Sequence, residues 1–133
     1  TRGFTKEHFV RATLESIAYQ SHSVLHAMEQ DAGMDIRTLK VDGGASANDF
    51  LMQFQADIMA AAGYRPGCIE TTALGAAYLA GLAVGFFKDK EEIKANWQLA
   101  KEFTPVMQEE RRKKLLRGWD KAVRCALCWQ EEE

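Results

Sequence analysis

The chain has 133 residues, of which 47% are hydrophobic and 27% are charged, and its formal net charge is −2 at pH 7. These values are typical of a globular domain and exclude an intrinsically disordered chain. A surface that binds nucleic acid is normally basic, so we expect no nucleic-acid partner. Three cysteines give no disulfide framework, which indicates a reducing compartment such as the cytoplasm.

No membrane segment is predicted. Residues 1–10 include Arg2, Lys6, Glu7 and His8, so they lack the apolar stretch of a signal peptide. The longest uncharged apolar stretch, Thr71–Phe87, is shorter than the roughly 20 residues of a spanning helix and is rich in Gly and Ala. We therefore expect a cytoplasmic protein without a membrane partner.

Residues 5–30 are predicted to form a long amphipathic helix, because apolar side chains recur there at three- and four-residue steps. These side chains are Val10, Leu14, Ile17, Val24, Leu25 and Met28. Thr5 is expected to cap the helix together with His8, and Gly33 is expected to end it. A strand over Ile36–Val41 follows, and it stops at Asp42-Gly43-Gly44 because Gly-Gly cannot continue a ladder comfortably.

A second helix is predicted over Ser46–Ala61, starting with a capping box between Ser46 and Asp49. Its expected buried stripe consists of Phe50, Leu51, Phe54, Ile58 and Met59. Residues 63–69 are predicted as a short strand or an extended link, and Pro66 restricts any strand there to an edge or an end.

Thr71 is expected to cap a third helix, Thr72–Val84, which is built largely of Gly and Ala. Gly inside a helix costs about 1 kcal/mol relative to Ala, so this composition indicates close approach of a sheet or a ligand. Two more helices are predicted over Asp89–Ala100 and Gln108–Trp129. The inner side of the last helix is expected to hold Leu115, Leu116, Trp119, Val123 and Leu127.

Three further patterns favour ordinary structural roles. Cys125 and Cys128 have no second ligand pair at a zinc-like spacing, so burial as small hydrophobic residues is favoured. His22 and His26 are four residues apart but lack a third ligand, so no metal site is predicted. The basic residues 111–114 follow two glutamates, which indicates a solvated helix face.

Strands separated by helices predict a helix-rich α/β fold with a small parallel sheet. The Asp42-Gly43-Gly44 turn would lie at the carboxyl edge of that sheet, where open α/β folds bind ligands. Gly43 and Gly44 carry no Cβ, so a flat ligand could approach the main chain, and the Asn48 amide offers a donor and an acceptor. The spacing matches no phosphate-binding motif, so a base or ribose is favoured over a transferred phosphate. The alternative is a plain tight turn, with Asn48 acting only at the helix start.

Two segments carry a family resemblance. VDGGASANDFLMQFQAD and IETTALGAAYLAGLAVG resemble the C-terminal part of the FGGY carbohydrate kinases, and among these the glycerol kinases in particular. ATLESIAYQ in the first helix and the tryptophan-containing last helix resemble the same family. The resemblance implies a ribonuclease-H-like, actin-like ATPase fold. It also implies that residues 1–133 form a single domain, the adenosine-side half of such a kinase, whose N-terminal catalytic domain is absent from this chain.

The resemblance implies an ATP-dependent kinase that transfers the γ-phosphate of ATP to glycerol and gives sn-glycerol 3-phosphate. Gly43, Gly44 and Asn48 would contact ATP or ADP, whereas Mg²⁺ and glycerol would be bound with the missing domain. No catalytic residue and no metal ligand is expected in this chain, so we expect it to be inactive alone.

Two alternatives stay open. The chain could come from another FGGY sugar or polyol kinase, or it could be a non-catalytic module that associates with itself. Homo-oligomers are expected because too few strands leave a sheet edge and apolar surface uncovered.

Overall fold

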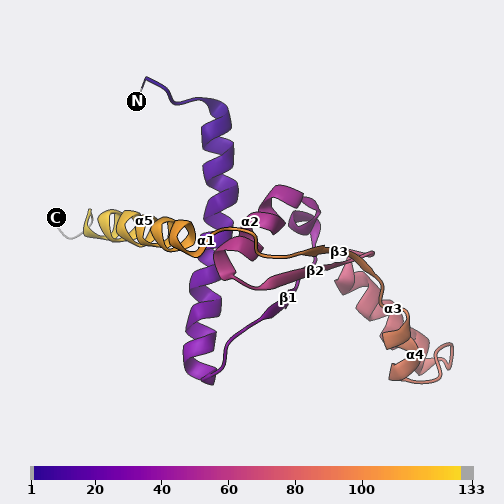
Figure 1. Ribbon diagram of the computed structural model, residues 1–133. Helices are drawn as coiled ribbons and strands as arrows, with labels where there is room; N and C mark the ends of the chain where they lie inside the picture. The colour runs from indigo at the N-terminus through magenta and orange to yellow at the C-terminus, as the bar shows by residue number, and fades with distance from the viewer. Residues whose placement is uncertain (1, 130–133) are drawn as a thin grey trace.

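The structure is a computed structural model that describes residues 2–129 (Figure 1). Helices dominate, and a small sheet lies between them. In chain order the elements are α1 (Lys6–Ala32), β1 (Thr38–Lys40), the short 3₁₀ helix η1 (Gly44–Ala47), α2 (Asp49–Met59), β2 (Ala62–Pro66), α3 (Thr71–Ala83), α4 (Lys90–Ala95), β3 (Leu99–Phe103) and α5 (Glu109–Cys128).

The sheet has the strand order β1-β2-β3. β1 and β2 are parallel, with Thr38 opposite Ala62, which confirms the predicted pairing. β3 is antiparallel to β2, with Gly63 opposite Phe103, so the predicted all-parallel sheet is wrong and the sheet is mixed. Pro66 lies at the end of β2, as expected, and the register shifts there.

The third strand replaces part of a predicted helix. α4 ends at Ala95, and Leu99–Phe103 then runs along β2 instead of completing a helix to Ala100. Ile93 and Trp97 are spaced as on one helix face, but Leu99 and residues 101–103 pair with β2. Pairing with a distant strand therefore overrides the local pattern.

The core lies where α1, α2 and α5 meet. Its buried apolar residues are Ala18, Tyr19, Leu51, Met52, Phe54, Ala56, Ile58 and Phe103. The Tyr19 ring meets Phe54 edge-on at 5.5 Å between centroids and stacks on Trp119 at 5.1 Å. Burying a large apolar side chain contributes about 1.5–3 kcal/mol, so this corner supplies much of the stability.

The predicted ends of α1 are confirmed, but most of the apolar side chains that predicted the helix are not buried. The Thr5 N–H donates to His8 Nδ1 at 3.2 Å, and Gly33 ends the helix in the left-handed conformation with φ 65°. Ala18 and Tyr19 are the buried residues of α1. Of the apolar residues that predicted the helix, Leu14 and Leu25 are half-buried, whereas Val10, Ile17, Val24 and Met28 are exposed. α1 thus carries a second apolar face that is open in this structure.

α3 and α4 lie beyond the end of the sheet, away from the α1–α2 corner (Figure 1). Only Gly81 is buried in α3, and a Cβ at that position would lie 2.6 Å from the ring of Phe87. Gly81 therefore makes room for the chain that follows its own helix, and not for a sheet or ligand as predicted. A Cβ at Gly75 would meet nothing within 4 Å.

α5 packs on the core through its first half only. Leu115, Leu116 and Trp119 contact the core as predicted, whereas Val123 and Leu127 are exposed. The second half of α5 projects away from the other elements (Figure 1). Cys125 and Cys128 lie on that half and are exposed and free, so their predicted burial is wrong.

No helix among residues 2–129 has the length and apolarity that crossing a membrane requires.

Candidate functional site

The turn after β1 lies at the carboxyl ends of both parallel strands. The Val41 N–H donates to Tyr64 O at 3.0 Å, and the Gly43 N–H donates to Ile69 O at 2.8 Å. Gly43 has φ 78° and ψ 169°, a conformation that residues with a Cβ rarely adopt. Glycine is therefore required at position 43 for the backbone to leave β1 and contact the segment after β2.

Ser46 is buried beneath this turn and stabilises it through hydrogen bonds to Gly43 O. Its hydroxyl donates to Gly43 O at 2.7 Å, its N–H donates to the same oxygen at 3.0 Å, and the residue is only 1% exposed. Ser46 thus lies in η1 and does not cap α2, so the predicted capping box with Asp49 is wrong. Two bonds to one carbonyl hold the chain in a 3₁₀ turn before the α-helix can start.

Asn48 is the N-cap of α2. Its Oδ1 accepts a hydrogen bond from the Leu51 N–H at 3.0 Å, and its backbone is extended with φ −82° and ψ 105°. The helix-start role considered as the plain alternative is therefore present. The side chain is exposed, and because capping uses only the oxygen, Nδ2 remains as a donor for a ligand.

Asp49 joins this turn to the sheet, which the sequence did not predict. Its carboxylate accepts from Lys101 Nζ at 2.6 Å and from Arg65 Nη1 at 2.8 Å. Hydrogen bonds from Lys101 and then from Arg65 lower the pKa of Asp49. Arg65 also donates to Ser46 O at 2.8 Å, so one guanidinium on β2 holds both η1 and the start of α2.

Arg65 and Lys101 are 16 and 52 residues from Asp49 in the sequence. Only the pairing of β2 with β3 brings them to one place. The local sequence offers one hint, a charged residue, Arg65, inside a short strand; in the structure its side chain is only 16% exposed.

Thr71 also acts differently from the prediction. It is the first residue of α3, whose N-cap is Glu70, and its hydroxyl donates to the Asp42 carboxylate. This bond and the Gly43–Ile69 bond tie the start of α3 to the turn after β1.

The outer side of the turn is open. A Cβ built on Gly43 or Gly44 would meet nothing within 4 Å. The N–H groups at the start of η1, on Gly44 and Ala45, have no intrahelical partner, as at the start of any helix. The three predicted site residues, Gly43, Gly44 and Asn48, thus share one accessible edge with free main-chain donors.

Among residues 2–129, no group of three or more His, Cys, Asp or Glu side chains could hold a metal ion. His22 and His26 stack with 5.8 Å between ring centroids. His26 Nε2 lies 3.2 Å from Gln30 Nε2.

Comparison with known proteins assigns a family. The FGGY family of carbohydrate kinases, C-terminal domain, matches residues 1–84. A glycerol kinase of Lachnoclostridium phytofermentans is 67% identical over 132 residues, which are 99% of this chain and 26% of that protein. Glycerol kinase 1 of Clostridium tetani is 62% identical over 133 residues, all of this chain and 27% of that protein. The chain therefore spans about a quarter of the length of the curated relatives it matches.

Solved structures agree on the fold. A crystal structure of Plasmodium falciparum glycerol kinase with ADP has a TM-score of 0.81 and 34% identity, and the match covers 93% of this chain and 25% of that one. A xylulose kinase of Lactobacillus acidophilus has a TM-score of 0.69 at 24% identity, covering 98% of this chain and 26% of that one. The match of residues 1–84 establishes that the chain belongs to the FGGY family of carbohydrate kinases, C-terminal domain.

Proposed function

We propose that this chain is the nucleotide-binding part of an ATP-dependent glycerol kinase, which transfers the γ-phosphate of ATP to glycerol and gives sn-glycerol 3-phosphate. The observation that carries the proposal is the 67% identity to a glycerol kinase across almost the whole chain. The structural relative with a TM-score of 0.81 is a glycerol kinase described with ADP, which supports adenosine nucleotides as the ligand.

The open edge after β1 is the proposed nucleotide site. Gly43 and Gly44 have no side chain to cover the main chain, so a flat purine or ribose can come within hydrogen-bonding distance of the N–H groups. Asn48 Nδ2 supplies a side-chain donor, since Oδ1 is engaged with Leu51. The hydrogen bonds from Arg65 to Ser46 O and to Asp49 hold this edge in one conformation without a ligand.

Residues 1–133 are proposed to form one domain on the adenosine side of the kinase. Phosphoryl transfer also needs charge stabilisation at the γ-phosphate, a metal site and a base. Asp42 and Asp49 are acids beside the proposed site. The Asp42 carboxylate already accepts from Thr71, and the Asp49 carboxylate from Arg65 and Lys101. We therefore assign the catalytic base, the Mg²⁺ ligands and the glycerol pocket to the remainder of the full-length kinase.

Titration of the ¹⁵N-labelled chain with ADP tests the nucleotide site. The amide signals of Gly43, Gly44 and Asn48 are expected to shift first and to saturate. Gly44→Val should weaken binding because its side chain would occupy the approach to the main chain. Gly75→Ala is the matched control, since its Cβ enters open space on α3. Shifts that bypass residues 43–48, or equal binding by both variants, would contradict the assignment.

An activity assay tests whether the catalytic groups lie outside this chain. The chain incubated with glycerol, ATP and Mg²⁺ should form no glycerol 3-phosphate above the rate without protein. Appreciable product would show that the catalytic groups lie within these 133 residues. This outcome is independent of the ADP titration, so the two parts of the proposal can fail separately.

Self-association is a second candidate function, favoured by the second apolar face of α1. Val10, Ile17, Val24 and Met28 are 41–61% exposed and follow one another at steps of seven, seven and four residues. A stripe of this spacing can pack against the same stripe of a second copy. Light scattering across a concentration series should show a dimer that Ile17→Glu disrupts. A monomer at all concentrations would exclude this role.

A further inference from the structure

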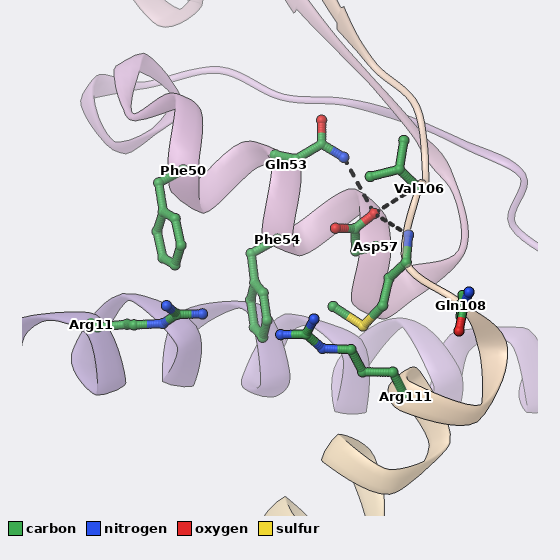
Figure 2. Close-up of a pocket in the computed structure, with 9 residues that line it drawn as sticks. Arg11, Phe50, Gln53, Phe54, Asp57, Val106, Gln108 and Arg111 are labelled. Atoms are coloured by element: carbon green, nitrogen blue, oxygen red, sulfur yellow. Dashed lines mark hydrogen bonds between the residues drawn. The ribbon is translucent and has the colours of Figure 1, made fainter. Parts of the chain in front are cut away.

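A cavity of about 530 Å³ lies between α1, α2 and the start of α5. Figure 2 shows side chains from all three helices and from the β3–α5 connection around it. Its lining includes none of Gly43, Gly44 and Asn48. Its volume is within the range of about 300–1,000 Å³ that small-molecule sites have.

Two phenyl rings form one wall of this cavity. Phe50 and Phe54 lie one helical turn apart on α2, and their rings are nearly parallel, with centroids 6.1 Å apart and 8° between the planes. Phe54 is buried against Tyr19, whereas Phe50 is 40% exposed. This wall offers a flat apolar surface to a ligand.

Two arginines bring positive charge to the same cavity. Both line it. The Arg11 guanidinium lies over the Phe50 ring, 5.3 Å from its centroid, and Figure 2 shows the Arg111 guanidinium directed toward the Phe54 ring. Arg11 donates to Glu15 Oε1 through Nε at 2.7 Å, which leaves its terminal nitrogens as donors. Among the contacts of residues 2–129, no ion pair involves Arg111. Planar guanidinium groups are the preferred partners of carboxylates and phosphates in proteins.

Asp57 fixes the shape of the cavity at its inner end. The residue is 8% exposed, and its Oδ1 accepts from the N–H groups of Val106 at 2.7 Å and Met107 at 3.1 Å. Gln53 Nε2 lies 3.3 Å from the same oxygen and donates to Thr104 O at 2.8 Å. These bonds hold the β3–α5 connection and thereby place the first turn of α5, which carries Arg111. The other carboxylate oxygen points toward the cavity in Figure 2.

We propose that this cavity is a binding site for a small organic anion with a ring-shaped or apolar body. The carboxylate or phosphate group would lie between Arg11 and Arg111, and the body would pack on Phe50 and Phe54. A hydroxyl or ammonium group on the ligand would donate to the free Asp57 oxygen. Binding is non-covalent, and it depends neither on the nucleotide site nor on kinase activity.

NMR titration of the whole ¹⁵N-labelled chain with phenyl phosphate tests the proposal, with phenol and inorganic phosphate as separate arms. Phenyl phosphate should give saturable shifts at the amides of Phe54, Met107 and Arg111. Phenol lacks the charge and phosphate lacks the ring, so each should bind about tenfold more weakly or worse. Arg111→Gln should weaken phenyl phosphate binding by about tenfold, because it removes one charged donor. Lys114→Gln, one turn further along α5, is the matched control and should bind as the unaltered chain does.

Three results would overturn the site. The first is the absence of saturable shifts at these amides, including a case in which phenyl phosphate perturbs only residues 43–48. The second is equal binding by Arg111→Gln and Lys114→Gln. The third is binding of inorganic phosphate as tight as that of phenyl phosphate, which would mean attraction to arginine charge without use of the cavity. Arg111→Lys keeps the positive charge but lacks the paired N–H donors of a guanidinium, so it should bind phenyl phosphate with intermediate affinity. Circular dichroism checks that each variant is folded.

Discussion

The α1–α2–α5 corner and the carboxyl edge of β1 and β2 are stabilised by different interactions. The corner holds buried aromatic and aliphatic side chains, with Tyr19 between Phe54 and Trp119. The edge is held by hydrogen bonds to main-chain groups, and two residues of the proposed nucleotide site, Gly44 and Asn48, are exposed there. A packed corner resists changes of side-chain volume, whereas the edge can stay open to a ligand because polar contacts from behind support it. Substitutions in the two regions should therefore differ in both the size and the kind of their effects.

The largest effect is expected in the corner. Ile58 is 0% exposed, so Ile58→Ala should leave a cavity and lower the free energy of unfolding by about 2–5 kcal/mol. Urea unfolding measures this loss. Leu79 on α3 is 71% exposed, and Leu79→Ala should change stability by about 0.5 kcal/mol or less. Similar losses at both positions would mean that α3 is packed as tightly as the corner.

The next effect should come from the support behind the edge. Arg65→Met removes the donors to Ser46 O and Asp49 while keeping an apolar stem, and should cost about 1–2 kcal/mol. ADP should also bind more weakly, because η1 loses its anchor. Arg37→Met is the control, since the Arg37–Asp35 pair is exposed and should contribute little. If Arg65→Met bound ADP as tightly as the unaltered chain, the hydrogen bonds from Arg65 would have no part in shaping the ligand site.

Two substitutions of Asn48 separate its capping role from its proposed role in binding. Asn48→Ala should cost about 1 kcal/mol of stability, since the Leu51 N–H loses its acceptor. Asn48→Asp keeps an acceptor and should regain most of that stability. It lacks the amide donor, however, and should still bind ADP more weakly than the unaltered chain. If Asn48→Asp restored both properties, the amide group would have no part in binding.

The smallest effect concerns His22, which lies where α1 faces α5. Burial, followed by the charges of His26 and Arg112, lowers the pKa of His22 in the folded chain. The unfolded chain then binds more protons, so stability is full above the ordinary histidine pKa of about 6.5 and falls as pH drops through the lowered value. Urea unfolding at pH 7.5 and pH 5.5 should show this loss, and His22→Gln should reduce it. An equal loss in His22→Gln would assign the pH dependence to other groups.

Features that depend on a few neighbouring residues could be predicted from the sequence. Thr5 and His8 start α1, Gly33 ends it, and β1 stops before Gly43, as expected. The start of α2 is three residues later than predicted, at Asp49 instead of Ser46. Ser46, Asn48 and Asp49 can all act near a helix start, and the choice depends on the Gly43 conformation and on Arg65, which lies on another strand.

Contacts between distant segments could not be predicted in this way. The predicted helix over Asp89–Ala100 included the first two residues of β3, and the rest of β3 was not predicted as a strand, because only pairing with β2 supplies the hydrogen bonds that make it one. The exposure of Cys125 and Cys128 follows from where α5 leaves the core, which no local pattern records. The cavity between Arg11 and Arg111 joins residues a hundred positions apart in the sequence.

The sequence by itself determined the two ends of α1, the glycine turn after β1 and the resemblance to FGGY kinases, because each depends on residues close together in the chain. The tertiary structure alone decided which face of α1 is buried, that the sheet is mixed, and that Arg65 and Lys101 meet Asp49. An amphipathic pattern shows that a face is apolar but not what covers it, since packing partners and strand register are set by contacts between distant segments.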